Sequence, residues 1–203
     1  MKLSVDAIMA IAFAIALGIV SVSRLFAPIF WGEDFAPCAY ILSALALSIP
    51  FSGFANVIRM QYLIPNGMDG AYILSVILGA VSNLTANSLL IPRCGALGAA
   101  VGTVIAEGVV CAAQCLAVKK RIDILAYLKS TAFFGMAGLL MYGAVQVLDQ
   151  RAEITVSWLL LEIVVGGSVY CILSVLYLYH TKNELLMTAL QKLGGAHQNN
   201  DRG

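Results

Sequence analysis

Charged side chains are scarce in this sequence. They make up 11% of its 203 residues, and the formal net charge is only +1, whereas soluble domains carry about 25% charged residues. A nucleic-acid partner requires a basic face, which this composition excludes. The shortage of charge also excludes an ordinary water-soluble surface.

Metal-binding, disulfide and catalytic patterns are missing as well. The cysteines, at positions 38, 94, 111, 115 and 171, include no CxxC pair, and His180 and His197 are distant from any paired ligand. We therefore expect no metal, no disulfide framework and no cofactor. There is no GxSxG, no phosphate loop and no HExxH motif, so no residue is assigned a catalytic role and we expect no enzyme.

Long apolar runs fill the sequence instead. Hydrophobic residues make up 61% of it, and its mean hydropathy is +0.90. A single core could not bury so much apolar surface, but a bilayer solvates it, and each span needs about 20 apolar residues. We predict an all-α, polytopic transmembrane bundle of about six helices, over 5–30, 35–58, 70–91, 96–118, 125–148 and 154–179. Turns are expected at 65–67 and 92–95, and Pro50 should kink the second helix.

The distribution of Lys and Arg predicts the orientation. No linker divides the chain, so we expect one helical bundle over 1–181 and a cytoplasmic polar tail over 182–203. With this helix count, one side of the membrane collects Lys2, Arg59, Lys119, Lys120, Arg121, Lys129, Lys182, Lys192 and Arg202. The other side has Arg24, Arg93 and Arg151. Because basic loops stay inside, both termini should be cytoplasmic.

Glu107 lies near the middle of the predicted fourth span, where a carboxylate is costly. It must be neutralised, paired or in contact with water. One interpretation is a cavity-facing proton or cation site, and the other is a protonated side chain bonded to a neighbouring helix. Both stay open.

Small residues recur every fourth position around Glu107. Gly98, Gly102 and Ala106 form one stripe, and a second stripe contains Gly95, Ala99, Thr103 and Glu107. Such spacing lets another helix approach closely, so we favour helix packing over ligand binding for Gly95, Gly98 and Gly102.

Two further polar sets lie inside predicted spans. Asn83 and Asn87 are one turn apart and should point into the bundle, where interhelical hydrogen bonding is favoured over substrate contact. Glu162 lies about two turns inside the last span, and we favour a structural role for it. Arg24, Arg59 and Lys129 lie near helix ends, where each either determines topology or attracts an anion such as phosphate.

Two long stretches carry a resemblance to a known family. RLFAPIFWGEDFAPCAYILSALALSIPFSGF, at 24–54, has a helix end, a short aromatic–Gly–acidic loop and an Ala-led helix. NVIRMQYLIPNGMDGAYILSVILGAVSNLTANSLLIPRCGALGAAVGTVIAE, at 56–107, has two Leu-Ile-Pro segments, an Asn pair and a Gly-x-x-Gly-Ala-Ala segment before Thr-x-x-x-Glu. Together they resemble the C-terminal half of polysaccharide or oligosaccharide flippases, within the exporter superfamily that also holds multidrug extruders. The resemblance puts these residues at family motif positions: Asn83, Asn87, Pro92, Gly95, Gly98, Thr103 and Glu107.

The resemblance implies a function and partners. It implies a transporter, or the C-terminal part of one, that flips a lipid-linked oligosaccharide for surface polysaccharide export, including lipopolysaccharide, in the bacterial inner membrane. Family members are roughly twice this long, so a missing N-terminal half or a second copy is an expected partner beside membrane lipid. The alternatives are a multidrug or metabolite extruder of the same superfamily and a truncated fragment that does not transport.

Overall fold

The computed structural model describes residues 1–150 and 153–180, and every regular element within them is helical. The elements, in chain order, are α1 (Lys2–Trp31), η1 (Glu33–Phe35), α2 (Cys38–Ala46), α3 (Ser48–Ile58), η2 (Arg59–Leu63), α4 (Asp69–Val118), α5 (Ile124–Asp149) and α6 (Val156–His180). The predicted all-α membrane bundle is confirmed, because five helical segments are long and apolar enough to cross a membrane.

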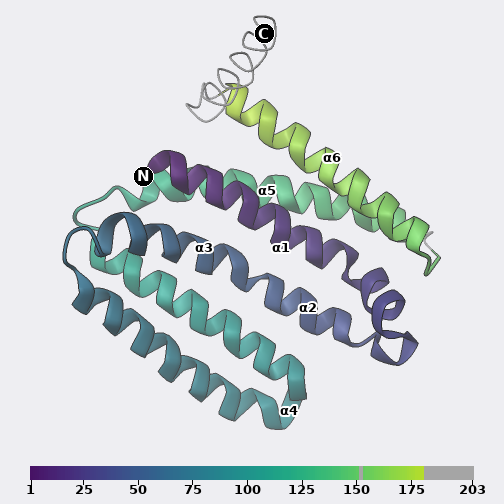
Figure 1. Cartoon of the computed structure of the whole chain (residues 1–203), viewed down its shortest axis with the longest axis horizontal. Coiled ribbons are helices and arrows are strands. Elements are labelled where there is room, and N and C mark those ends of the chain that lie inside the picture. The colour runs from purple at the N-terminus through teal and green to yellow at the C-terminus, as the bar shows by residue number, and fades with distance from the viewer. Residues whose placement is uncertain (151–152, 181–203) are drawn as a thin grey trace, which may run out of the picture.

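Helix α4 crosses twice. Its 50 residues are interrupted at Gly95, which has φ 55° and ψ −134°, a conformation that glycine adopts without a Cβ penalty. The chain reverses there, and the two arms of α4 lie side by side (Figure 1). Five segments, one of which crosses twice, give the six crossings expected from the sequence.

The second span is two helices in one line. The sequence predicted a kink at Pro50, but the break lies earlier, between α2 and α3, where Leu47 has ψ −13°. A proline ring clashes with the carbonyl group four residues before it, so the helix is disrupted ahead of the proline. Pro50 then occupies the first turn of α3, where a missing N–H has no cost. Beyond α3 the chain widens into the π-helical η2 and turns at Gly67, which has φ 65°.

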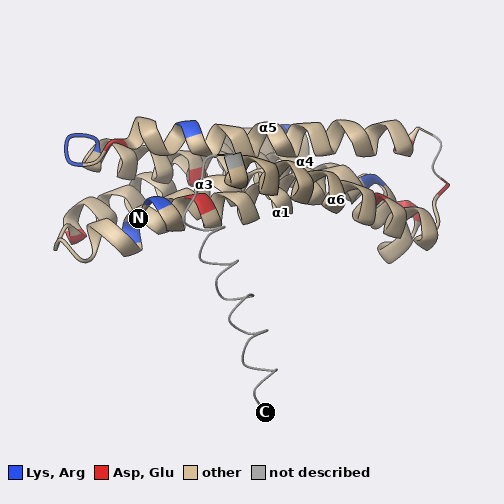
Figure 2. Cartoon of the chain, turned by 90° about the horizontal axis from the view of Figure 1, so that it is seen from above, with Lys and Arg blue, Asp and Glu red and all other residues tan. Residues whose placement is uncertain are grey.

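The helices form a row. Helix α6 packs on both α5 and α1, which also pack on each other. Helix α1 packs in turn on α2 and α3, and these two pack on the α4 hairpin (Figure 1). The start of α1, the end of η2, the end of α4 and the start of α5 meet at one end of the bundle. Most of the Lys and Arg residues, blue in Figure 2, lie near this end, which also holds the N-terminus. That agrees with the predicted charge asymmetry, while cytoplasmic termini remain a prediction.

Several sequence predictions fall outside the described residues. The polar tail over 182–203, with its Lys182, Lys192 and Arg202, lies beyond 180, and Arg151 lies in the gap at 151–152. The agreement between the predicted and observed positions of Lys and Arg concerns residues 1–150 and 153–180.

Two apolar clusters hold the row together. The larger lies at the basic end and contains these buried side chains: Val5, Met9, Phe54, Val57, Ile58, Leu63, Val118 and Phe134. The smaller joins α1, α5 and α6 through Leu17, Ala137, Met141 and Tyr170. Because lipid solvates apolar side chains as well as protein does, these clusters stabilise the bundle through van der Waals packing and not through removal from water.

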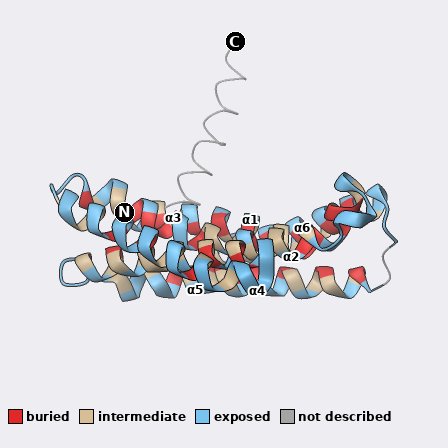
Figure 3. Cartoon of the chain, turned by 90° about the horizontal axis from the view of Figure 1, so that it is seen from below, coloured by how far each residue is buried: buried red, intermediate tan, exposed pale blue. Residues whose placement is uncertain are grey.

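Exposed residues occur along all the helices (Figure 3), and many of them are large apolar side chains. In the most apolar 18-residue stretch of α4 only 17% of the residues are buried. Ile77, Val81 and Leu84 are among the exposed side chains of α4. Such continuous apolar exposure is incompatible with water and is what a bilayer or a second helical lobe covers. The chain is a multi-pass membrane protein.

Candidate functional site

A polar pocket lies between α3, η2 and the two arms of α4. Its volume is about 390 Å³. Apolar residues form part of its wall, and the polar and charged side chains that line it are Ser52, Asn56, Arg59, Asn83, Glu107 and Gln114. Three elements contribute them, so the pocket exists only after α4 has folded back against α3. Water-accessible polar groups inside an apolar bundle mark a candidate site.

Glu107 lies where two pockets meet. It lines the polar pocket, and it also lines a second space of about 410 Å³ between α1 and α3. The side chain is half-buried. Its side chain therefore borders two open hollows of the bundle, and both interpretations from the sequence stay predictions.

Arg59 supplies the positive charge of the pocket. Its Nη2 donates a hydrogen bond to Oδ1 of Asn56, and its guanidinium carbon lies 5.3 Å from the ring centroid of Tyr72. That distance is within the range of a cation–π interaction. Arg59 and Glu107, both in the described part of the chain, line one pocket without forming a salt bridge with each other.

Asn83 and Asn87 bond to each other along α4. Nδ2 of Asn87 donates to Oδ1 of Asn83 at 2.9 Å, while the buried Oδ1 of Asn87 receives no hydrogen bond. Only Asn83 lines the polar pocket. Thr103 donates from Oγ1 to the carbonyl oxygen of Ala99, one turn earlier, at 3.1 Å.

Gln114 belongs to the pocket, although the sequence analysis missed it. It is 1% exposed, and its Nε2 donates to Oγ of Ser75 on the other arm of α4 at 3.1 Å, while its Oε1 has no partner. The seven-residue spacing between Glu107 and Gln114 could have identified it. Gln114 lies two helical turns after Glu107, on the same face of an apolar span.

The three glycines differ in role. A Cβ at Gly98 would lie 2.5 Å from the carbonyl oxygen of Leu90, and a Cβ at Gly102 would overlap Oδ1 of Asn87. Both permit close approach of the two arms. Gly95 does not: a Cβ there would meet no atom within 4 Å, and its positive φ makes the turn. The packing role predicted for Gly95 is therefore wrong, because the chain reverses before a second helix could contact it.

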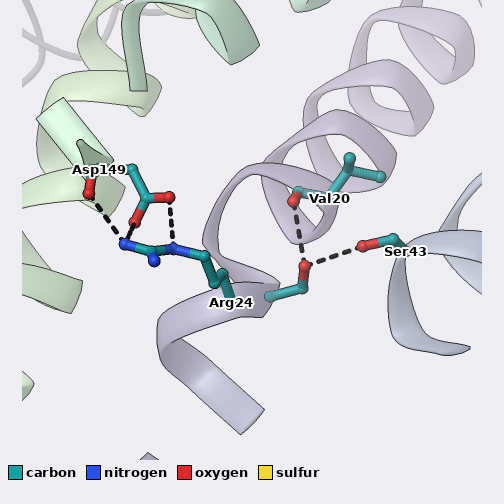
Figure 4. Close-up of polar contacts among 5 residues, drawn as sticks. Val20, Arg24, Ser43 and Asp149 are labelled. Carbon is teal, nitrogen blue, oxygen red and sulfur yellow. Dashed lines mark hydrogen bonds and ion pairs between the residues drawn. The ribbon is translucent and has the colours of Figure 1, made fainter. Parts of the chain in front are cut away.

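Arg24 and Lys129 lie away from the pocket, which corrects their prediction as cavity residues. Arg24 is bound to Asp149 at the opposite end of the bundle (Figure 4): Nε lies 2.5 Å from Oδ2, and Nη2 donates to Oδ1 at 2.6 Å and to the backbone oxygen at 2.8 Å. Nearby, Ser23 bonds to Val20 and Ser43. Lys129 is exposed on α5. Of the three predicted cations, Arg59 alone lines the polar pocket, because the helix ends that carry Arg24 and Arg59 lie at opposite ends of the bundle.

Glu162 lies at the Arg24 end. It is 1% exposed, and it interacts electrostatically with Asp149 and Arg24. Asp149 was not among the predicted site residues, because the fifth span was predicted to end at residue 148, which put this carboxylate in a loop.

Comparison with known proteins places the fold. No family model and no curated protein matches the sequence. One solved structure that resembles the chain is "Lipid II flippase MurJ, inward closed conformation", with a TM-score of 0.75 and 19% sequence identity. The likeness covers 88% of this chain but only 38% of that one. The chain therefore has the fold of a lobe of a flippase, and it spans well under half the length of the protein it resembles.

Proposed function

We propose that this chain forms one lobe of a transporter that flips a lipid-linked oligosaccharide across the bacterial inner membrane for surface polysaccharide export. The observation that carries the proposal is the polar pocket between α3 and the α4 hairpin, in which Arg59 and Glu107 are unpaired with each other. The fold likeness to a lipid II flippase and the family motifs at 24–107 support it.

The mechanism would be alternating access. Two lobes rock against each other, and a polar cavity opens to each side in turn. The sugar-pyrophosphate head crosses in the cavity while the lipid tail remains in the bilayer. In this scheme Arg59 offsets the pyrophosphate charge, the amides of Asn83 and Gln114 bond to sugar hydroxyls, and Glu107 couples ion movement. The second lobe is an N-terminal half or a second copy.

Export from cells tests the proposal. The gene is deleted, and full-length protein is supplied as the wild type, Arg59→Ala, Glu107→Gln or the control Lys129→Ala, at equal membrane abundance. Loss of a charged contact costs more than about 1.4 kcal/mol, so we expect roughly tenfold less surface polysaccharide in the first two variants. Wild-type export in both would refute the proposal.

A multidrug or metabolite extruder is the second candidate. The position of Glu107 favours this candidate. Its carboxylate lines two neighbouring pockets and would attract a cationic substrate. Efflux of cationic dyes from the same strains discriminates the two. Dye efflux that depends on Glu107, with normal polysaccharide export, would select the extruder.

A further inference from the structure

Glu162 is a buried carboxyl group that the proposed transport site does not use. It lies in the second turn of α6, is 1% exposed, and neither of its carboxyl oxygens receives a hydrogen bond. An ionised carboxylate buried in this way, without a donor, is strongly disfavoured. Such a group becomes neutral or binds a cation.

The charged groups around Glu162 come from both helices packed against α6. Helix α1 contributes Arg24 and helix α5 contributes Asp149. Arg24 directs Nε and Nη2 to the carboxylate of Asp149 and makes no hydrogen bond to the oxygens of Glu162 (Figure 4). On α6 itself, Tyr170 and Cys171 line the same pocket as Glu162, and the Tyr170 hydroxyl donates to the backbone oxygen of Ala10 at 2.7 Å.

Glu162 lies near a second carboxyl group, that of Asp149, with which it interacts electrostatically. Two ionised carboxylates repel each other, and neither carboxyl oxygen of Glu162 has a hydrogen-bond partner that would offset the repulsion. Both carboxylate oxygens of Asp149 are bound by Arg24, which balances the charge there. A proton on Glu162 therefore removes the one carboxylate charge at this site that no donor or cation balances.

We propose that Glu162 is a proton-binding site, in which its buried carboxyl group holds a proton beside the Asp149 carboxylate that Arg24 binds. The site lies at the opposite end of the bundle from the basic loops. It borders an apolar pocket of about 320 Å³ between α1, α5 and α6. Arg24, whose side chain is 59% exposed, connects it to water. The proposal is independent of what the Glu107 pocket binds.

Infrared spectroscopy of the purified full chain in lipid tests the site directly. A protonated carboxyl group has a carbonyl band that is separate from the ionised carboxylate bands and shifts in D₂O. We expect this band at neutral pH in the wild type, reduced by one carboxyl group in Glu162→Gln and unchanged in Glu153→Gln, whose parent residue is an exposed carboxylate at the same end. The amide that Glu162→Gln introduces has the size of the protonated carboxyl group and is also neutral, so the variant should fold.

The pH dependence of stability is the second measurement. A folded protein that holds one more proton than its unfolded chain loses stability as the pH rises, by about tenfold in the folding equilibrium constant per pH unit. The thermal midpoint should fall from mildly acidic to mildly alkaline pH in the wild type and Glu153→Gln, because an unfolded Glu loses its proton already in mild acid, and this fall should be absent in Glu162→Gln.

Either of two results would overturn the proposal. The first is a wild-type spectrum with no protonated carboxyl band at neutral pH, or a band that Glu162→Gln does not reduce. The second is a midpoint that rises with sodium chloride but not with choline chloride and loses this response in Glu162→Gln, which would assign the site to a metal cation. The wild-type spectrum and the wild-type pH titration need no variant. They therefore test whether the protein holds a protonated carboxyl group even if Glu162→Gln fails to fold.

Discussion

Gln114 and Ser75 are 39 residues apart in sequence and 3.1 Å apart between Nε2 and Oγ, because α4 folds back on itself at Gly95. The bond ties the two arms of the hairpin together beside the polar pocket. It also leaves Oε1 of Gln114 without a partner, in a wall that Arg59 and Glu107 share. This hydrogen bond therefore depends on the reversal of α4 at Gly95, and it holds one residue of the candidate site in place.

Ser75→Ala should destabilise the protein through Gln114. The buried amide would lose its partner, at a cost of about 1–3 kcal/mol. The control is Ser88→Ala, since the exposed Ser88 bonds only to the carbonyl oxygen of Leu84 on its own helix. Thermal midpoints in detergent measure both variants, and equal midpoints would mean that the bond between the arms contributes no stability.

Gly98→Ala should separate the arms of the hairpin. The new Cβ would lie 2.5 Å from a backbone oxygen, which has no rotamer to relieve the clash, so we expect a loss of about 1–3 kcal/mol. Gly108 lies on the same arm, and a Cβ there would meet no atom within 4 Å. Gly108→Ala should instead gain up to about 1 kcal/mol from helix propensity. Matched effects in the two variants would contradict the close approach at Gly98.

Arg24 and Asp149 should show a measurable coupling energy. Asp149 is 8% exposed, so Arg24→Ala leaves a nearly buried carboxylate unpaired, and we expect a loss of about 1–3 kcal/mol. Arg24 is 59% exposed, which places the loss near the lower figure. Arg24→Ala with Asp149→Asn should cost less than the sum of the single variants. Arg93→Ala, at the exposed hairpin turn, is the neutral control.

Cys94 tests the membrane topology. It is exposed at the turn of α4, at the opposite end from the basic loops, so cytoplasmic termini would put it outside. In a variant that keeps Cys94 as its sole cysteine, a membrane-impermeant maleimide added to intact cells should label it. A matching variant whose single cysteine comes from Lys120→Cys should react only after the cells are opened. The reverse pattern would invert the orientation.

The candidate site could be predicted only in part. Glu107 and Asn83 stand out as polar groups in apolar spans, and Arg59 as a cation at a helix end, so composition alone nominated them. Arg24 carried the same signal, yet it pairs with Asp149, which lies 125 residues away. Nothing in a local pattern says which of several helix-end cations will meet a buried carboxylate. Gln114 was missed because a neutral amide attracts less attention than a charge, although it is as buried as the apolar core.

The sequence by itself determined that the solvent is a bilayer, how many times the chain crosses it, and where the chain turns. These follow from local composition: apolar runs of spanning length, and proline or glycine where a helix must break or reverse. The tertiary structure decided which polar groups share a space. Arg59 and Glu107 line one pocket, and Arg24, Asp149 and Glu162 gather at the other end, because the packing of distant helices sets those distances and no local preference encodes it.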